Sequence, residues 1–282
     1  MFSVKEFRRI YKMKKILSLV LAAATVMALS ACGSSSNSSA STAASSAAAS
    51  TASKDTLILG CDVNFAPMGF KDGDNVVGFD IDLAKAVIED KMGKKLVIQP
   101  IDWSSKEAEL DTGKVDLLWN GLTITDERKE KMCFSKPYME NKQVIVVKKG
   151  SDIKSKADLN GKNVVMQKES TAVDAWKDAG ITANVTELKD NVLCLNEIST
   201  GRADAAIMDS VVANYYLAKQ ADQYPFVILD DSLANELYGV AVKKGNEALM
   251  EEIQKALDET ISDGTAAKIA TNWFGSDTMY KG

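Results

Sequence analysis

The feature that most limits how this chain can fold is a short phrase that occurs twice. Residues 113–116 read GKVD and residues 201–204 read GRAD, and each stands just before an apolar stretch. In both, glycine ends a stretch with helical periodicity, a cation and an aspartate follow, and a strand begins. Because the phrases hold matching places in two series of strands and helices, the sequence predicts two similar lobes.

Each series alternates strands with helices. In the first half we expect strands at residues 56–60, 96–98 and 115–118, and helices starting near residue 79, at Ser104 or Ser105, and at Thr125. In the second half we expect strands at 163–166, 185–188 and 205–208, and helices starting at Ser170, near residue 191 and at Asp209. This alternation predicts an α/β protein whose sheets are parallel and covered on both faces.

Two further strands are expected to carry the chain between the lobes, at residues 143–148 and 238–242. A long helix at 247–263 and a shorter one through Trp273 follow, and we expect this tail to pack on the first lobe. Lobe 1 is therefore predicted to comprise residues 54–141 and 238–282, and lobe 2 residues 142–237. Two crossings form a hinge, and hinged lobes close on ligands.

Ligands of such sheets bind beyond the carboxyl ends of the strands. Two facing lobes bring two such edges to one cleft, so the polar and aromatic residues at these ends are the candidates for a binding site. In lobe 1 they are Asp62, Asn64, Phe65, Asp102, Trp103, Asn120, Gly121, Thr123 and Arg128. In lobe 2 they are Gln167, Lys168, Glu169, Ser170, Thr171 and Asp209.

The composition argues against several classes of protein. The net charge is -5, and the segment before Cys32 holds six cations and one acid, so the remainder is more acidic still. An acidic body disfavours nucleic acid as a partner. The absence of histidine excludes Ser-His-Asp and Cys-His catalysis and the usual zinc sites. Cys61, Cys133 and Cys194 lack metal-ligand spacing, which favours separate buried thiols, although one disulfide stays open. We expect no metal and no cofactor.

The N-terminus reads as an export signal. A cationic patch ends at Lys15, and residues 16–29 are apolar but too few to span a bilayer, which takes about 20. Residues 29–32, LSAC, resemble the lipobox of bacterial lipoproteins, in which the cysteine is lipidated; an ordinary signal peptide is the alternative. We therefore expect a lipoprotein signal peptide at 1–31, and a lipidated Cys32 with a flexible Ser/Ala linker at 32–53.

Four motifs together resemble the family 3 extracellular solute-binding proteins, the receptors of polar amino acid ABC transporters. They are GFDIDLA at 78–84, GLTITDER at 121–128, FSKPY at 134–138, and the closing segment 263–275. The resemblance covers residues 56–275. It implies a two-lobed periplasmic-binding-protein-like fold of type II, with two Rossmann-like lobes joined by a two-strand hinge.

The resemblance also implies roles for residues that would hold the ligand backbone. Arg128 is similar to the arginine that takes the α-carboxylate, which suits a planar guanidinium with two parallel hydrogen bonds. Thr123 resembles a residue that adds a backbone N–H and a hydroxyl to that carboxylate, and Thr171 does so from the other lobe. Asp209 resembles the acid that takes the α-ammonium, beside the carbonyl of Gly121.

The ligand side chain would meet a second group of residues. Phe65 and Trp103 stand where the family puts aromatic rings against it, and Asp62 and Gln167 align with residues that read its polarity. Asn120 departs from the family, because small Ser or Ala is common there in relatives. Arginine, glutamine, lysine, histidine and cystine all stay open as ligands.

These features predict a monomeric extracytoplasmic receptor, held to the membrane by lipid, that delivers an amino acid to an ABC transporter permease and is not an enzyme. Two alternatives remain. Cyclohexadienyl dehydratases share the fold, and a cleft with Asp62, Glu169 and Arg128 has groups for acid–base work. A lipoprotein that senses its ligand through a signalling partner is the other.

Overall fold

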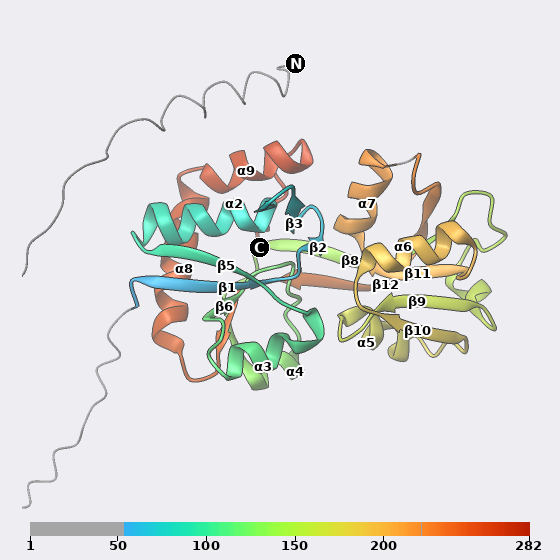
Figure 1. The fold of residues 1–282 in the computed structure, drawn as a ribbon, viewed down its shortest axis with the longest axis horizontal. Helices are drawn as coiled ribbons and strands as arrows, with labels where there is room; N and C mark the ends of the chain where they lie inside the picture. Colours follow the sequence, from blue (N-terminus) through green and yellow to red (C-terminus); the bar gives the residue numbers. More distant parts are fainter. Residues whose placement is uncertain (1–53, 221) are drawn as a thin grey trace, which may run out of the picture. The chain divides into compact units, whose positions relative to one another are not determined.

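A computed structural model of the chain describes residues 54–220 and 222–282 (Figure 1). The predicted signal peptide at 1–31 and the predicted lipid-modified Cys32 with its linker lie outside the described residues. Among the residues that are described, no helix has both the length and the apolar character needed to cross a membrane. They form two five-stranded sheets, a three-stranded sheet and the helices around them.

The first large sheet is built from both ends of the described chain. β1 (Thr56–Cys61) pairs in parallel with β5 (Lys95–Pro100) and β6 (Leu117–Leu118). β13 (Ala241–Lys243) pairs antiparallel with β6 and with β7 (Met132–Phe134). The strand order is therefore β5-β1-β6-β13-β7, and the segment after residue 238 completes the sheet that the first segment begins.

The second large sheet has the order β10-β9-β11-β8-β12. β9 (Asn163–Gln167) pairs in parallel with β10 (Asn184–Leu188) and β11 (Ala205–Asp209). β8 (Met139–Lys148) is antiparallel to β11 and to β12 (Phe226–Tyr238). The prediction of parallel sheets holds for β1, β5 and β6 and for β9, β10 and β11, but it fails for the pairings made by β13 and β8, which are antiparallel. The strands that arrive from the other sheet run against the repeated strand–helix series.

β8 and β12 form a long antiparallel pair beside the first sheet (Figure 1). Their register runs from Met139 opposite Tyr238 to Lys148 opposite Phe226, with irregularities around Ser232. Most of β12 was missed from the sequence, and the strand predicted at 238–242 is instead the end of β12 followed by β13. This pair places the ends of β8 and β12 next to the first sheet.

Helices cover both large sheets. Around the first sheet lie α2 (Phe79–Lys85) with a π-helical turn at Ala86–Lys91, α3 (Lys106–Asp111) after a 3₁₀ turn at Trp103–Ser105, α4 (Asp126–Lys131), α8 (Glu247–Ser262) and α9 (Thr265–Phe274). Around the second lie a 3₁₀ turn at Lys156–Leu159, α5 (Thr171–Asp178), α6 (Asn191–Thr200) and α7 (Ser210–Lys219). α9 packs on α2 and on α8, so the tail returns to the first sheet.

A small antiparallel sheet that the sequence analysis missed follows β1. It consists of β2 (Asn64–Phe65), β3 (Gly69–Asp72) and β4 (Asn75–Val77). β2 contacts α6 of the second sheet. The main apolar cluster is continuous across both large sheets and includes Trp119, Tyr138 and Tyr238.

The predictions of the helix N-caps were only partly correct. Thr125 caps α4 by accepting a hydrogen bond from the Arg128 backbone N–H at 3.1 Å, as predicted. Neither Ser104 nor Ser105 caps through its side chain; Asp102 does so by accepting from the Ser104 backbone N–H. Ser170 and Asp209 precede α5 and α7 without a capping hydrogen bond. The Ser170 hydroxyl donates to the Gln167 carbonyl at 2.7 Å, and Asp209 accepts from Tyr238 and Asn141.

The three described cysteines, Cys61, Cys133 and Cys194, are free thiols. Cys61 and Cys194 are buried, and burial raises the pKa of both thiols well above its usual range. The expectation of separate thiols is confirmed, and the disulfide that the sequence left open does not form among the described residues.

Candidate functional site

The carboxyl ends of strands from both large sheets meet in one buried polar region. Asp62 follows β1, and Thr123 follows β6 in the chain. Gln167 ends β9, and Thr171 begins the next helix. Gln167 Nε2 donates to Asp62 Oδ2 at 2.8 Å, and the hydroxyl oxygens of Thr123 and Thr171 lie 3.3 Å apart. Residues expected from opposite lobes are therefore in direct contact.

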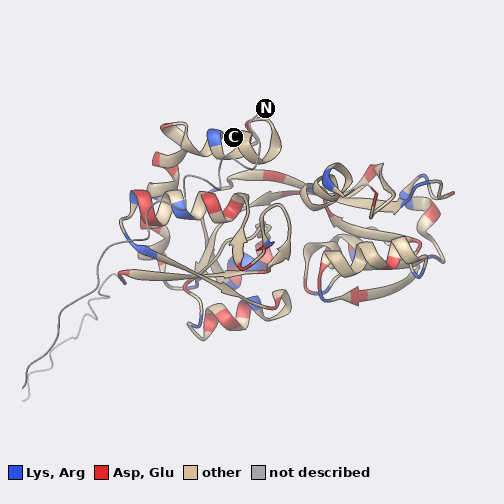
Figure 2. Cartoon of the chain, turned by 45° about the horizontal axis from the view of Figure 1, so that its top comes forward, with Lys and Arg blue, Asp and Glu red and all other residues tan. Residues whose placement is uncertain are grey.

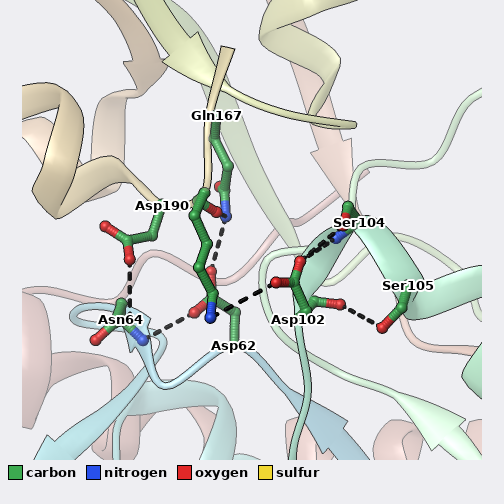
Figure 3. Close-up of polar contacts among 8 residues, drawn as sticks. Asp62, Asn64, Asp102, Ser104, Ser105, Gln167 and Asp190 are labelled. Atoms are coloured by element: carbon green, nitrogen blue, oxygen red, sulfur yellow. Dashed lines mark hydrogen bonds and ion pairs between the residues drawn. The ribbon is translucent and has the colours of Figure 1, made fainter.

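Asp62 lies among several carboxylates at one end of this region (Figure 3). Its Oδ1 accepts from the Asn64 backbone N–H at 2.9 Å. Burial raises the pKa of the Asp62 carboxyl, hydrogen bonds from Asn64 and Gln167 oppose that shift, and the charges of Asp190 and Asp102 add to it. The arrangement leaves a buried negative charge that a cation would stabilise.

The contacts around Asp62 also join the two sheets. Asn64 Nδ2 donates to Asp190 Oδ2 at 3.1 Å, and Lys189 forms an ion pair with Asp102 at 3.6 Å (Figure 3). A hydrogen bond from Ser104 lowers the pKa of the Asp102 carboxyl. Lys189 pairs with Asp102, one of the three acids Asp62, Asp102 and Asp190, so negative charge remains in excess.

Arg128 lies in the first turn of α4 and is only 7% exposed. One guanidinium nitrogen donates to the Thr123 carbonyl at 2.9 Å, and the side chain forms no salt bridge with any described residue. Burial lowers the pKa of Arg128, while the charges of Glu236 and Asp209 act in the opposite direction. A buried charge without a close counter-ion costs on the order of several kcal/mol, so Arg128 is poised for an anion.

Asp209 ends β11 and is 5% exposed. Its Oδ1 accepts from Tyr238 OH at 2.6 Å and from Asn141 Nδ2 at 2.7 Å. Asn141 Nδ2 also donates to Glu236 Oε2 at 2.8 Å. Burial, and then the charge of Glu236, raises the pKa of Asp209 to about 7. No cation forms a salt bridge with Asp209 among the described residues.

Glu236 connects this carboxylate pair to the threonines. Its Oε2 accepts from Thr123 Oγ1 at 3.1 Å and from Gln143 Nε2 at 3.0 Å. Gln143 Nε2 also lies 3.4 Å from Thr171 Oγ1. Arg128 and Asp209 are therefore linked through one network of polar side chains that spans β8, β12 and the ends of both sheets.

Asn120 and Gly121 form the turn that follows β6. Asn120 Oδ1 accepts from the Asp62 backbone N–H at 2.6 Å, so this side chain fixes the backbone after β1. The Gly121 N–H donates to the buried Asp80 at 2.7 Å, and Gly121 has a φ of 59°. A Cβ added at Gly121 would lie 2.8 Å from the Phe65 ring, so only glycine fits there.

The two predicted aromatic residues are placed differently from each other. Phe65 is 6% exposed and belongs to the main apolar cluster, whereas Trp103 is 7% exposed and belongs to a smaller cluster beneath α3. Lys106 Nζ lies 5.2 Å from the centre of the Trp103 ring and donates to the Glu169 carbonyl at 2.8 Å. Lys106 thus covers Trp103 and ties α3 to the segment before α5.

A polar cavity of about 250 Å³ adjoins Arg128. Residues of α3 and α4 line it on one side and residues around α5 on the other, and of the candidates at the strand ends Arg128, Glu169 and Ser170 line it. Acidic and basic residues are interspersed along the helices (Figure 2). Among the described residues, no group of three or more acids, thiols or imidazoles is arranged to hold a metal ion.

The sequence analysis missed seven residues of this region: Lys106, Asn141, Gln143, Lys189, Asp190, Glu236 and Tyr238. Four of them lie on the paired strands β8 and β12. Asn141 and Gln143 are two positions apart, as are Glu236 and Tyr238, so each pair faces one side of its strand. Polar residues at alternate positions of a buried strand were the available signal.

The sequence matches the family model described as bacterial extracellular solute-binding proteins, family 3, over residues 57–276. A curated relative, the arginine-binding extracellular protein ArtP of Bacillus subtilis, is 36% identical over 264 residues, which cover 93% of this chain and 98% of ArtP.

Two solved structures of amino acid-binding proteins also match most of the chain. An ABC uptake transporter substrate-binding protein from Streptococcus pneumoniae with bound histidine is 37% identical, with a TM-score of 0.77 over 80% of this chain and 95% of its own. The ancestral amino acid-binding protein AncCDT-1, a precursor of cyclohexadienyl dehydratase, is 39% identical, with a TM-score of 0.72 over 78% of this chain and 96% of its own. The expected two-lobed type II fold is confirmed.

Proposed function

The chain belongs to family 3 of the bacterial extracellular solute-binding proteins, and from that premise we propose that it captures a free amino acid between its two lobes and delivers it to an ABC transporter permease. The observation that carries this proposal is a pair of opposite charges. Arg128 and Asp209 are both buried, neither forms a salt bridge with a described residue, and one polar network joins them.

An amino acid carries the two charges that these residues lack. Its α-carboxylate pairs with Arg128 and with the hydroxyls of Thr123 and Thr171, and its α-ammonium pairs with Asp209 beside the Gly121 carbonyl. The ligand replaces the water that the buried charges have lost, so it offsets part of their desolvation cost. Because it touches both lobes, it favours the closed form over the open one.

The ligand's side chain points to Asp62 in this arrangement, and a cationic side chain suits the surroundings best. Lys189 pairs with Asp102, the charges of Asp102 and Asp190 act on Asp62, and the Asp62 carboxylate is buried. Gln167 binds Asp62 from the other lobe, while Phe65 and Trp103 provide apolar walls. We therefore place arginine and lysine ahead of glutamine, histidine and cystine. ArtP, named for arginine binding, is consistent with that order.

Titration calorimetry with a panel of free amino acids tests this function. We expect arginine or lysine to bind with a Kd of about 1 µM or tighter, which corresponds to roughly -8 kcal/mol. Arg128→Ala abolishes that binding, and Lys129→Ala, which removes an exposed cation from the same helix, leaves it unchanged. Tight binding of the same ligand by the Arg128→Ala protein contradicts the proposal.

The remaining parts of the proposal concern the protein's place in the cell. Residues 1–31 are removed as a signal peptide, Cys32 receives lipid, and residues 33–53 form the tether of a monomer on the extracytoplasmic side of the membrane. Lobe 1 comprises residues 54–141 and 238–282, and lobe 2 residues 142–237. Mass spectrometry of the membrane fraction, which detects an acylated Cys32 as the first residue, distinguishes this from secretion in soluble form.

A dehydratase activity is the second candidate, because AncCDT-1 is described as a precursor of such an enzyme. Asp62, Glu169 and Arg128 would have to act on a cyclohexadienyl acid instead of an amino acid. Incubation of the purified protein with prephenate or arogenate decides between the two: turnover supports the enzyme, and its absence together with tight amino acid binding supports the receptor. Loss of labelled amino acid uptake after gene deletion separates transport from sensing.

A further inference from the structure

Asp209 and Glu236 form a buried pair of carboxylates that share a donor. Asn141 Nδ2 donates to Asp209 Oδ1 at 2.7 Å and to Glu236 Oε2 at 2.8 Å, so both oxygens lie within reach of one amide nitrogen. Asp209 is 5% exposed and Glu236 is 9% exposed. Two carboxylates at this separation and depth repel each other strongly when both are charged.

One acceptor beside the pair has no hydrogen-bond donor among the described residues. Gln143 is fully buried, its Nε2 donates to Glu236, and its Oε1 has no hydrogen-bond partner among the described residues. An acceptor left without a donor at this depth costs free energy, and it lies on the same amide that binds Glu236. The unpaired oxygen of Gln143 thus points to a ligand that brings several N–H groups.

We propose that Asp209 and Glu236 together form the ammonium site, and that the pair holds one proton when the cleft is empty and gives it up to solvent when an amino acid binds. This inference rests on the proposed function and adds a second acid and a proton to it. The α-ammonium brings three N–H donors, and Asp209, Glu236, the free Oε1 of Gln143 and the Gly121 carbonyl are the acceptors that share them.

The charged and titratable groups around the pair come from three directions. Tyr238 of β12 donates its hydroxyl proton to Asp209, and Arg128 of α4 is the cation whose pKa responds to both acids. β8 contributes only the uncharged amides of Asn141 and Gln143. Burial and the neighbouring Glu236 raise the pKa of Asp209 to about 7, which agrees with a pair that keeps one proton near neutral pH.

Ligand binding makes the carboxylate pair favour the fully deprotonated state. The α-carboxylate neutralises Arg128, and the ammonium places a full positive charge against both acids, which lowers the pKa of the protonated one. The proton passes to water or buffer, no bond of the ligand changes, and the ammonium keeps its own protons. Binding is therefore an exchange of one proton for one ammonium group.

This exchange predicts a pH-dependent affinity. Below pH 7 the pair must lose its proton for the ligand to bind, and above pH 7 it has already lost it. With Asp209 titrating at about 7, the affinity rises about tenfold between pH 6 and pH 8 and then levels off. Close to one proton is released per ligand at pH 6, and close to none at pH 8.

Titration calorimetry of the full protein at pH 6 and pH 8 measures this release, in phosphate and in imidazole buffer, which differ in their heat of ionisation. L-Arginine and L-glutamine are the probes, because neither side chain titrates in this range. Glu236→Gln keeps an oxygen that accepts from Thr123, Asn141 and Gln143 but removes the like charge. In that variant the buffer dependence disappears and the affinity becomes independent of pH.

Asp230→Asn is the matched control, since it removes an exposed acid from the same strand and leaves the proton release unchanged. The result that overturns the inference is tight binding of a probe with no buffer dependence at pH 6, or a proton release that survives in Glu236→Gln. Either leaves the receptor function intact. The failure of both probes to bind at any pH refutes the proposed function and, with it, this inference.

Discussion

The side-chain amide of Gln167 donates to the carboxylate of Asp62 at 2.8 Å, which joins the end of β9 to the end of β1 (Figure 3). Asp62 is buried, and its other oxygen is held by the Asn64 backbone. The carboxylate is thus fixed in place by uncharged donors. A cationic ligand side chain is the partner that the proposed function assigns to this charge.

Replacing Asp62 with asparagine should change which amino acid binds. The substitution removes the negative charge, so we expect arginine to lose about tenfold more affinity than glutamine, or about 1.4 kcal/mol of binding free energy. Calorimetry with both amino acids measures the ratio. Asp72→Asn removes an exposed acid from β3 and should leave the ratio unchanged. An equal loss for both ligands indicates that Asp62 only supports the local backbone.

Arg128→Met should move stability and affinity in opposite directions. In the ligand-free protein it removes a buried cation that has no salt bridge, so the free energy of unfolding should rise by about 1 kcal/mol or more. Binding should fall by more than 100-fold, because the α-carboxylate loses its charged hydrogen bonds. Urea unfolding and calorimetry measure the two effects. Lys129→Met, on the exposed side of the helix, serves as the control. A large loss of ligand-free stability would falsify the view that Arg128 is unpaired.

Lys106 should make the stability of the protein rise at alkaline pH. Burial, followed by the charge of Arg128, lowers the pKa of its amine to about 8. The unfolded chain keeps this amine protonated up to about pH 10. Between these values the unfolded state binds more protons than the folded state, so the free energy of unfolding increases with pH.

Lys106→Met should flatten this increase between pH 8 and pH 10. Urea unfolding of both proteins at half-unit steps gives the difference, and Lys114→Met, which removes an exposed lysine paired with Glu109, should follow the unsubstituted protein. Identical pH profiles for Lys106→Met and the unsubstituted protein show that Lys106 keeps its proton throughout.

The strands and helices of the repeated series were predictable because each is determined by residues that are close together in the sequence. β1, β5, β9 and β11 are rich in β-branched and other apolar residues, and glycines 113 and 201 end their helices with φ values of 73° and 74°. The rule that ligands gather at the carboxyl ends of strands then predicted most of the buried polar region.

Glu236 could not be found in that way because its place depends on distant partners. It meets Gln143, 93 residues earlier in the chain, only when β12 pairs with β8. The acids and irregular pairing within β12 hide its strand pattern. Lys106 was missed for a similar reason. A lysine near the start of a helix is expected to be solvent-exposed, and only the folded structure brings the Glu169 carbonyl to its amine.

Gly121→Ala should damage both folding and binding. The residue has a φ of 59°, which costs an L-residue roughly 1–2 kcal/mol. The new Cβ would also lie 2.8 Å from the Phe65 ring and 3.2 Å from the Tyr238 ring, and these two buried rings cannot both move away from it. Gly113→Ala is the matched control, because Gly113 has a φ of 73° but an added Cβ there meets nothing within 4 Å.

Both substitutions destabilise the backbone conformation, and only Gly121→Ala adds a steric clash. We therefore expect Gly121→Ala to lose roughly 1–3 kcal/mol more free energy of unfolding than Gly113→Ala. It should also weaken amino acid binding at least tenfold, while Gly113→Ala binds normally. If both variants lose the same free energy of unfolding and both bind normally, Phe65 and Tyr238 do not approach the turn at Gly121 closely.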